Sequence, residues 1–334
     1  MGSDGSPDAG ARADEDSLGN LGAVYQDHFG LRSAPFGLTP DTDFFFARAS
    51  HQAALNTLLV ALRSGEGFLK VTGEIGLGKT TLCRRLLRAL AEEGESKWTT
   101  AYLPHPAGSR AALLLMVAEE LDCLPRTVRE RESELMLGTI QQRLLKIART
   151  GARTVLVVDE AQALPDEVLE VVRLLTNLET EQDKLLQVVL FGQPELDLRL
   201  GQPQLRQLRQ RIGFSHRLEP LSRTQFVAYV THRLQVAGGA PDLFEPDTLG
   251  LLFRASRGVP RTINMLCHKS LLAAYGPGAS RVRRTHALAA IADTESARLP
   301  LWQWPAALLR DHPGWLAAAI GAGTGLALLL HFVA

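Results

Sequence analysis

The sequence has 334 residues, 36 Lys and Arg, 36 Asp and Glu, 46% hydrophobic residues and three cysteines. These values exclude a disulfide-stapled mini-protein, a collagen and a wholly disordered chain. Because the formal net charge is zero, the chain has no protein-wide positive field, and we do not expect nucleic acid among its partners.

The first residues have the composition of a disordered tail. Residues 1–20 are mostly Gly, Ser, Ala, Asp and Glu. Ordering them would lose backbone entropy without burying apolar surface, so we predict a disordered acidic tail. The tail also lacks the basic and apolar regions of a secretory signal peptide.

Short apolar runs alternate with helical patterns as far as about residue 220. The runs are apolar on both faces, as in buried parallel strands, and comprise 68–72, 99–103, 154–158 and 187–191, with a more polar fifth at 214–218. Helical patterns lie between them, at 80–91, 110–121, 132–149 and 167–178. The alternation predicts an α/β domain, for which we take residues 21–221, with a parallel sheet sandwiched by helices.

A glycine-rich loop follows the first strand. Residues 73–81, GEIGLGKTT, match the pattern GxxxxGK[ST] between an apolar strand and a helix. The glycines let backbone N–H groups turn toward phosphate oxygens, and the helix N-terminus adds partial positive charge. Lys79 is expected to reach the β and γ phosphates, Thr80 to ligate Mg²⁺ and Thr81 to approach the α phosphate. The loop predicts a nucleotide site formed by Gly73, Glu74, Ile75, Gly76, Leu77, Gly78, Lys79, Thr80 and Thr81.

Two acids end a later apolar strand. In TVLVVDEAQ the strand runs into Asp159 and Glu160, and the carboxyl ends of parallel strands share one edge of a sheet. We predict that Asp159 holds Mg²⁺ through water and that Glu160 orients and deprotonates the attacking water. The alternative is an acid pair that only complements a helix dipole.

Strand patterns stop after residue 222. Four amphipathic stretches follow, at 224–236, 246–255, 261–275 and 285–294. They predict a small all-helical domain at 222–296.

The last residues form a long uncharged apolar run. Residues 315–333, WLAAAIGAGTGLALLLHFV, approach the length that a hydrocarbon core of about 30 Å requires. We predict a transmembrane helix there, after a juxtamembrane linker at 297–314. Arg298 and Arg310 precede it, which indicates a single-pass tail anchor in the inner membrane with the remainder in the cytoplasm. The alternative is a core helix that is apolar on all sides.

From residue 25 to about residue 294 the sequence resembles the AAA+ ATPases, and more closely the general secretion pathway protein A type. The segment YQDHFGLRSAPFGLTPDTDFFF at 25–46, followed by His51, is similar to that subgroup's N-terminal signature. ExeA-like secretion proteins and MshM-type pilus ATPases carry similar segments. The resemblance implies ATP and Mg²⁺ as ligands, and a place for 25–46 in the adenine pocket. The alternative is that the phenylalanines of this segment form an aromatic cluster that packs against the edge of the domain.

The resemblance also implies roles for four further residues. Gln193, in LFGQPEL, matches the position of the sensor of the γ-phosphate. Arg211 is the first candidate, and Arg209 the second, for the arginine that such ATPases present to the nucleotide of a neighbouring subunit. An arginine that acts in this way implies a homo-oligomer. Arg261, in RGVPRTINMLC, matches the sensor of the lid domain. For Gln193 the residue pattern alone indicates only a strand and a turn. The alternative for Arg209 and Arg211 is a solvated face or a patch that binds DNA phosphates, and for Arg261 it is a helix-capping surface arginine.

These inferences lead to a functional hypothesis and two alternatives. The first is a membrane-anchored, cytoplasmic AAA+ ATPase that works with envelope assembly proteins on a type II secretion, MSHA or type IV pilus, or exopolysaccharide-export machine. Secretion-type members continue past their membrane helix into a peptidoglycan-binding region, whereas this sequence stops at Ala334. We therefore expect it to be closer to the shorter pilus- or exopolysaccharide-associated members. The second is a DNA-associated switch of the origin-recognition or transposition type, with contacts at Arg281, Arg283 and Arg284. The third is a scaffold that nucleotide only stabilises.

Overall fold

The protein is described by a computed structural model that covers residues 24–37, 49–105, 107–124, 133–179 and 184–297. The chain divides into two compact units. An α/β unit comprises Ala47–Pro220, and a helical unit comprises Met1–Phe46 together with Leu221–Ala334.

Three predicted segments fall wholly or almost wholly outside the described residues. They are the acidic tail at 1–20, the linker at 297–314 and the transmembrane helix at 315–333. Among the helices in the described ranges, none combines the length and the apolar character that crossing a bilayer requires.

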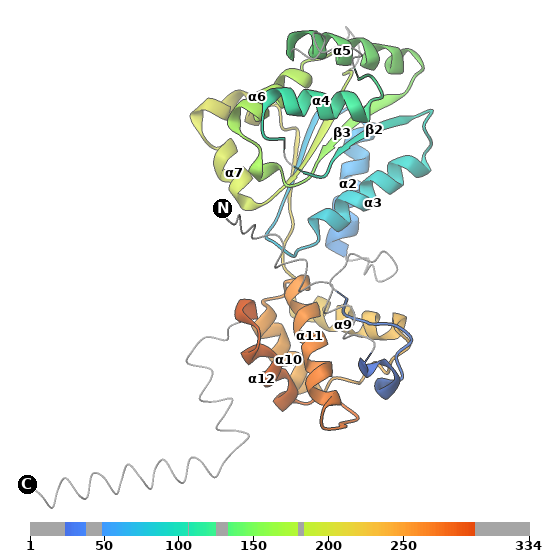
Figure 1. Ribbon diagram of the computed structural model, residues 1–334, viewed down its shortest axis with the longest axis vertical. Helices are drawn as coiled ribbons and strands as arrows, with labels where there is room; N and C mark the ends of the chain where they lie inside the picture. The colour runs from blue at the N-terminus through green and yellow to red at the C-terminus, as the bar shows by residue number, and fades with distance from the viewer. Residues whose placement is uncertain (1–23, 38–48, 106, 125–132, 180–183, 298–334) are drawn as a thin grey trace, which may run out of the picture. The chain divides into compact units, whose positions relative to one another are not determined.

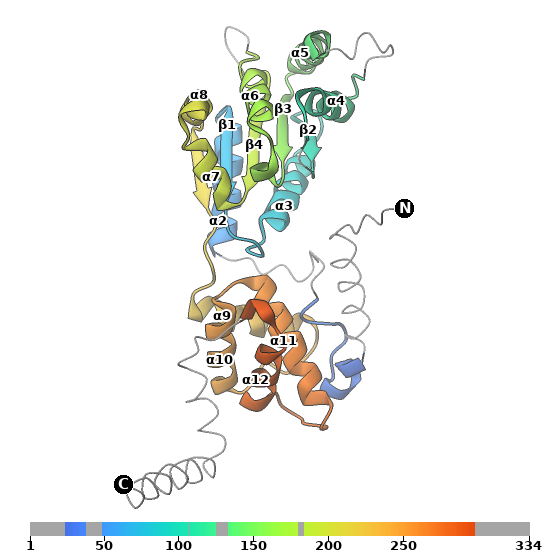
Figure 2. The ribbon, with the colours of Figure 1, turned by 60° about the vertical axis from the view of Figure 1, so that its left-hand side comes forward.

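The α/β unit is built on a parallel sheet (Figure 2). In the described part of the chain this sheet has five strands in the order β2-β3-β4-β1-β5. Their bounds are β1 Phe68–Thr72, β2 Trp98–Leu103, β3 Arg153–Val158, β4 Gln187–Gly192 and β5 Phe214–Arg217. All strands predicted from the sequence are confirmed, including the polar fifth, which lies at the edge beside β1. Its exposure there explains its polar composition.

Helices cover both faces of the sheet (Figure 1). They are α2 Ala49–Arg63, α3 Lys79–Glu92, α4 Arg110–Glu120, α5 Ser133–Arg149, α6 Asp166–Leu175, α7 Pro194–Leu200 and α8 Arg206–Gln210. Helices α4 to α8 share one apolar core with alternate strand residues such as Leu156 and Val158. Helices α2 and α3 pack together on the opposite face. The sequence patterns predicted α3 to α6 within a few residues, but they indicated no helix before β1.

The helical unit contains α9 Arg223–Val236, α10 Pro246–Ser256, α11 Pro260–Tyr275 and α12 Arg284–Ala292, as the domain pattern predicted. The Ser222 side chain and Gln225 cap α9 reciprocally. In the RGVP turn, Gly258 accepts a 2.8 Å hydrogen bond from the Leu221 N–H. A Cβ at Gly258 would stand 2.3 Å from the Leu221 carbonyl oxygen, so the turn requires glycine.

Residues 24–37 belong to the helical unit, and their assignment to the α/β domain was wrong. Tyr25, Phe29 and Phe36 are buried in the core formed by α9 to α12. The Tyr25 hydroxyl shares a 2.8 Å hydrogen bond with Nδ1 of His268 on α11. Aromatic burial against a core distant in sequence decides this placement, and no local pattern shows it.

A buried arginine holds this N-terminal segment to the helical unit. Arg233, on α9, donates to the Pro35 carbonyl and, at 2.8 Å, to the Tyr229 hydroxyl. Only 7% of Arg233 is exposed. The Tyr229 hydroxyl in turn donates to Asn264, at 2.8 Å. These bonds connect α9 and α11 to the Pro35 carbonyl, which lies outside helices and strands and therefore needs a side-chain donor.

We expect an Arg233→Met substitution to loosen residues 24–37. Methionine keeps an apolar stem but leaves the buried Pro35 carbonyl without this donor, which costs about 1–3 kcal/mol. Hydrogen-exchange mass spectrometry of the full chain should show faster exchange in peptides that cover 24–37, by about 5- to 150-fold. The control is Arg254→Met, on the exposed side of α10, which should change nothing. Unaltered exchange in Arg233→Met would contradict this role.

Candidate nucleotide site

The glycine-rich loop lies between β1 and α3, as predicted. Gly73 follows β1 directly, and its N–H donates to the Gly192 carbonyl at the end of β4, at 3.2 Å. Gly78 forms the N-cap of α3 with φ 90°, a left-handed conformation that favours glycine. The loop therefore starts between two neighbouring strands and ends on a helix N-terminus, where backbone N–H groups bind anions.

Lys79 lies folded over the loop. Its Nζ donates to the carbonyls of Gly73 and Glu74, at 2.8 and 3.1 Å, and 5% of the residue is exposed. Burial lowers the pKa of Lys79, while the carboxylates of Glu160 and Asp159 oppose that change. The ammonium group is thus held at the loop, where phosphate oxygens would replace the carbonyls as its partners.

Thr80 and Asp159, the two predicted metal ligands, lie together. The Thr80 hydroxyl donates to Asp159 Oδ2 at 2.9 Å, and the N–H of Glu160 donates to Oδ1 at 2.9 Å. Burial raises the pKa of Asp159, an effect that the two hydrogen bonds oppose. A hydroxyl and a carboxylate supply the oxygen atoms that Mg²⁺ prefers, so these residues fit the predicted ion.

Glu160 sits in a strained conformation and between two amides. Its φ is 52°, which is rare for a residue other than glycine and is found at functional sites. Its Oε2 accepts from Nε2 of Gln162 at 2.6 Å and from Nε2 of Gln193 at 3.3 Å. The backbone N–H of Gln193 donates to Gln162 Oε1, at 2.9 Å. The structure therefore brings the predicted sensor and the predicted base into contact.

Helix α7 fixes this arrangement. Its Asp197 accepts a 2.8 Å hydrogen bond from the hydroxyl of Thr72, and pairs with Lys70, both on β1. Its Arg199 donates to the Gln162 carbonyl at 2.8 Å and pairs with Asp166. Because α7 begins directly after Gln193, these contacts fix the positions of Gln193, of the acidic end of β3 and of β1, which leads into the glycine-rich loop, relative to one another.

Sequence reasoning missed Gln162, Asp197 and Arg199. Gln162 has a weak local indication, since it stands two residues after Glu160 in DEAQ. Asp197 and Arg199 have none, because their partners lie on β1 and before α6. The Asp197 contacts depend on β1 lying beside β4, and the Arg199 contact with Gln162 depends on β3 lying beside β4. Both adjacencies are properties of the topology.

The three predicted arginines lie away from these contacts or in the other unit. Arg209 and Arg211, at the end of α8, are exposed. Arg211 donates to the carbonyl of Thr176 in a long hydrogen bond of 3.5 Å. Arg261 is exposed in the first turn of α11. Their assignment to a neighbour's nucleotide and to the lid sensor stays a prediction.

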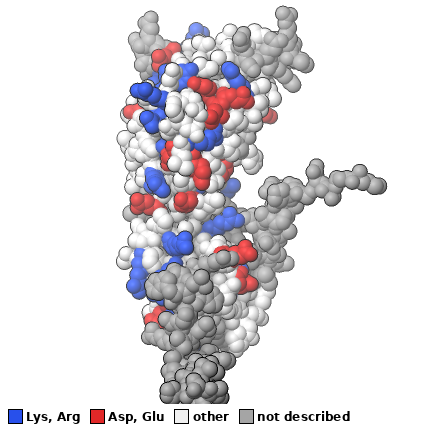
Figure 3. All heavy atoms as spheres, turned by 90° about the vertical axis from the view of Figure 1, so that its left-hand side faces the viewer, with Lys and Arg blue, Asp and Glu red and all other residues white. Residues whose placement is uncertain are grey.

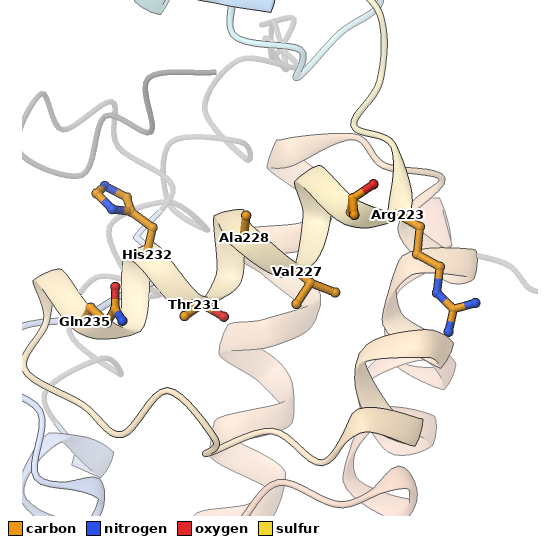
Figure 4. Close-up of a pocket in the computed structure, with 7 residues that line it drawn as sticks. Arg223, Val227, Ala228, Thr231, His232 and Gln235 are labelled. Atoms are coloured by element: carbon orange, nitrogen blue, oxygen red, sulfur yellow. The ribbon is translucent and has the colours of Figure 1, made fainter. Parts of the chain in front are cut away.

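The helical unit has a hollow along α9 (Figure 4). Side chains that recur every four residues line it, namely Arg223, Thr224, Val227, Ala228, Thr231, His232 and Gln235. None of them is a predicted site residue, and the hollow supplies no carboxylate for metal or proton chemistry. The nucleotide site is therefore assigned to the loop of the α/β unit.

These features define the class of protein. A glycine-rich loop after β1, an acidic pair after β3 and the polar Gln193 after β4 meet at the carboxyl edge of a β2-β3-β4-β1-β5 sheet, where α/β proteins bind ligands. Together with the matches that follow, this arrangement makes the protein a nucleotide-binding ATPase of the AAA+ class.

Known proteins agree with that class and narrow it. A family described as "AAA domain" matches residues 62–200. General secretion pathway protein A of Aeromonas hydrophila is 43% identical over 259 residues, which are 78% of this chain and 46% of that protein. Over these residues the chain is similar to general secretion pathway protein A, and the AAA-domain match agrees with the AAA+ class. The chain spans about half the length of this relative.

Solved structures of low identity share the fold. The Aeropyrum pernix ORC2 protein, in ADPNP and ADP complexes, matches with a TM-score of 0.55 and 18% identity, over 80% of this chain and 74% of that one. The Aeropyrum pernix ORC1 protein in complex with DNA matches with a TM-score of 0.56 and 20% identity, over 78% and 69%. At this identity the likeness supports the AAA+ fold alone.

Proposed function

We propose that this protein hydrolyses ATP with Mg²⁺ and uses the energy to assemble or remodel a bacterial envelope machine. The main support for this proposal is the group of hydrogen bonds around Glu160. The carboxylate stands between two amides and directly after Asp159, which bonds the Thr80 hydroxyl. This is a site for activating water beside a phosphate loop.

The residues of the site divide the chemistry among them. The N–H groups of the loop and of the first turn of α3, with Lys79, bind the phosphates. Thr80 and Asp159 would hold Mg²⁺, whose charge offsets that of the phosphate oxygens. Glu160 takes the proton of the attacking water, and Gln193 exchanges its bond to Glu160 for one to the γ-phosphate.

The envelope role depends on the family and on the C-terminal residues. The relative from Aeromonas hydrophila is named for the general secretion pathway. The apolar run at 315–333 supports attachment to the inner membrane, with the ATPase domain in the cytoplasm. The exposed Arg209 and Arg211 support a homo-oligomer in which one subunit completes its neighbour's site. Residues 222–296 are proposed as the lid, with Arg261 as its sensor.

The DNA-switch alternative is not favoured by the charge distribution. Arg281 pairs with Asp242, and Arg283 lies 3.5 Å from Glu245. On the face in Figure 3, blue and red side chains are interspersed over the described part of the chain. Compensated arginines offer little net charge to a phosphodiester backbone.

We expect Lys79→Ala to weaken ATP binding by about 10- to 150-fold, since a hydrogen bond to a charged group contributes about 1.5–3 kcal/mol. Titration of the full chain with a fluorescent ATP analogue measures the change, and phosphate release measures turnover. Lys97→Ala, an exposed lysine of the same unit, is the matched control. Turnover at the wild-type rate in Lys79→Ala would refute hydrolysis at this loop.

A further inference from the structure

His51 contacts the phosphate loop from outside it. It lies on α2, 5% of it is exposed, and its Nε2 stands 2.9 Å from the carbonyl oxygen of Leu77. A carbonyl only accepts hydrogen bonds, so Nε2 carries the proton and donates. The ring also faces the next residue, because a Cβ built on Gly78 would stand 3.2 Å from the same Nε2. The imidazole therefore lies against the last peptide of the loop.

That contact determines how the peptide is oriented. In a trans peptide the C=O and the following N–H point in opposite directions. With the Leu77 carbonyl bonded to His51, the N–H of Gly78 is directed away from α2. Gly78 is the N-cap of α3, so this N–H precedes those of the first helical turn, which point out of a helix N-terminus toward an anion.

We propose that His51 is a positioning residue that presets the Leu77–Gly78 peptide for phosphate. The inference deepens the proposed function, since it rests on nucleotide binding at this loop. His51 does not bind phosphate itself, because its Nε2 proton is already donated to Leu77. Its effect is on affinity: without the bond, the peptide must be turned and held when the anion arrives, which reduces the binding free energy.

The position also explains the glycine at the end of the loop. Gly78 has φ 90°, and the His51 ring occupies the space next to its Cα. A side chain at residue 78 would meet both a strained backbone and the imidazole. The left-handed φ favours glycine at this position, and the imidazole that directs the N–H also leaves little room for a Cβ.

Four variants of the full chain test this role. His51→Leu fills the space but cannot donate, His51→Gln has an Nε2 that can reach the same carbonyl, and His51→Asn is too short. His28→Leu is the matched control, because His28 also donates to a carbonyl, that of Ala279 at 2.9 Å, but in the helical unit. Binding of ADP and of inorganic pyrophosphate is measured calorimetrically without Mg²⁺, beside the unfolding temperature of each nucleotide-free variant.

We expect His51→Leu and His51→Asn to bind both probes about 2- to 12-fold more weakly, the worth of one neutral hydrogen bond. His51→Gln and His28→Leu should stay within about twofold of wild type. Pyrophosphate lacks the base and the sugar, so a loss for this probe places the effect at the phosphates.

The possible failures are distinct. If His51→Leu binds pyrophosphate like the wild type, or if His51→Gln is as weak as His51→Asn, His51 only packs, and the inference is overturned. Should His51→Leu fail to fold, the comparison of Gln with Asn decides in the same way. A wild-type chain that binds neither ADP nor pyrophosphate overturns the proposed function itself, and the inference with it.

Discussion

Replacing Glu160 by Gln is expected to lower the rate of ATP hydrolysis by about 10²- to 10⁴-fold, the usual contribution of a positioned general base. Glutamine keeps the size of the side chain and an oxygen that accepts from Gln162 and Gln193. Its amide takes no proton from water. ATP binding should therefore persist, since Lys79 and the loop backbone are untouched.

Two measurements separate the steps in this variant. Phosphate release reports turnover, and titration with a fluorescent ATP analogue reports binding. The control is Glu167→Gln, an exposed acid of α6 in the same unit, which should hydrolyse ATP at the wild-type rate. Wild-type turnover in Glu160→Gln would remove this carboxylate from the mechanism.

Replacing Arg211 by Ala is expected to reduce turnover by about 10³-fold or more, with ATP binding unchanged. The arginine is exposed at the end of α8, so it is available to another subunit. If it acts there, Arg211→Ala and Glu160→Gln chains have complementary defects. Mixed oligomers contain interfaces where an intact Glu160 site meets an intact Arg211.

The decisive measurement is the ATPase activity of the mixture. Two nearly inactive preparations should regain a fraction of wild-type turnover once their subunits exchange, which labelled chains verify by size-exclusion chromatography. Arg209→Ala, mixed in the same way, is the matched comparison. Recovery with Arg209→Ala alone would transfer the role to Arg209. A mixture that exchanges subunits but stays inactive contradicts action in trans.

Much of the nucleotide site is predictable from local sequence. The loop at 73–81 and the acidic pair Asp159–Glu160 occupy the expected ends of strands, whereas Gln193 after β4 was indicated only by the family resemblance. The loop and the acidic pair each depend on a short pattern, because an apolar strand followed by glycines or acids has few other stable uses. The helices of the second unit are equally local, since their apolar spacing shows in the sequence.

The remaining site residues act over long sequence distances. Gln193 meets Glu160 across 33 residues, and His51 meets Leu77 across 26. Asp197 bonds Thr72 across 125. The pairs that involve Gln193 and Asp197 form only when strands far apart in sequence become neighbours, and no periodicity records which strands those are. The His51 pair forms only when α2 packs beside the phosphate loop.

The sequence by itself determined the class of this protein, because the phosphate loop after β1 and the two acids after β3 are each short local patterns that directly follow an apolar strand. Only the tertiary structure decided the unit to which residues 24–37 belong, and the residues that hold Glu160 and the Leu77 carbonyl in place. The reason is physical: local spacing controls which elements form, whereas packing and hydrogen bonds between distant elements control where each side chain is held.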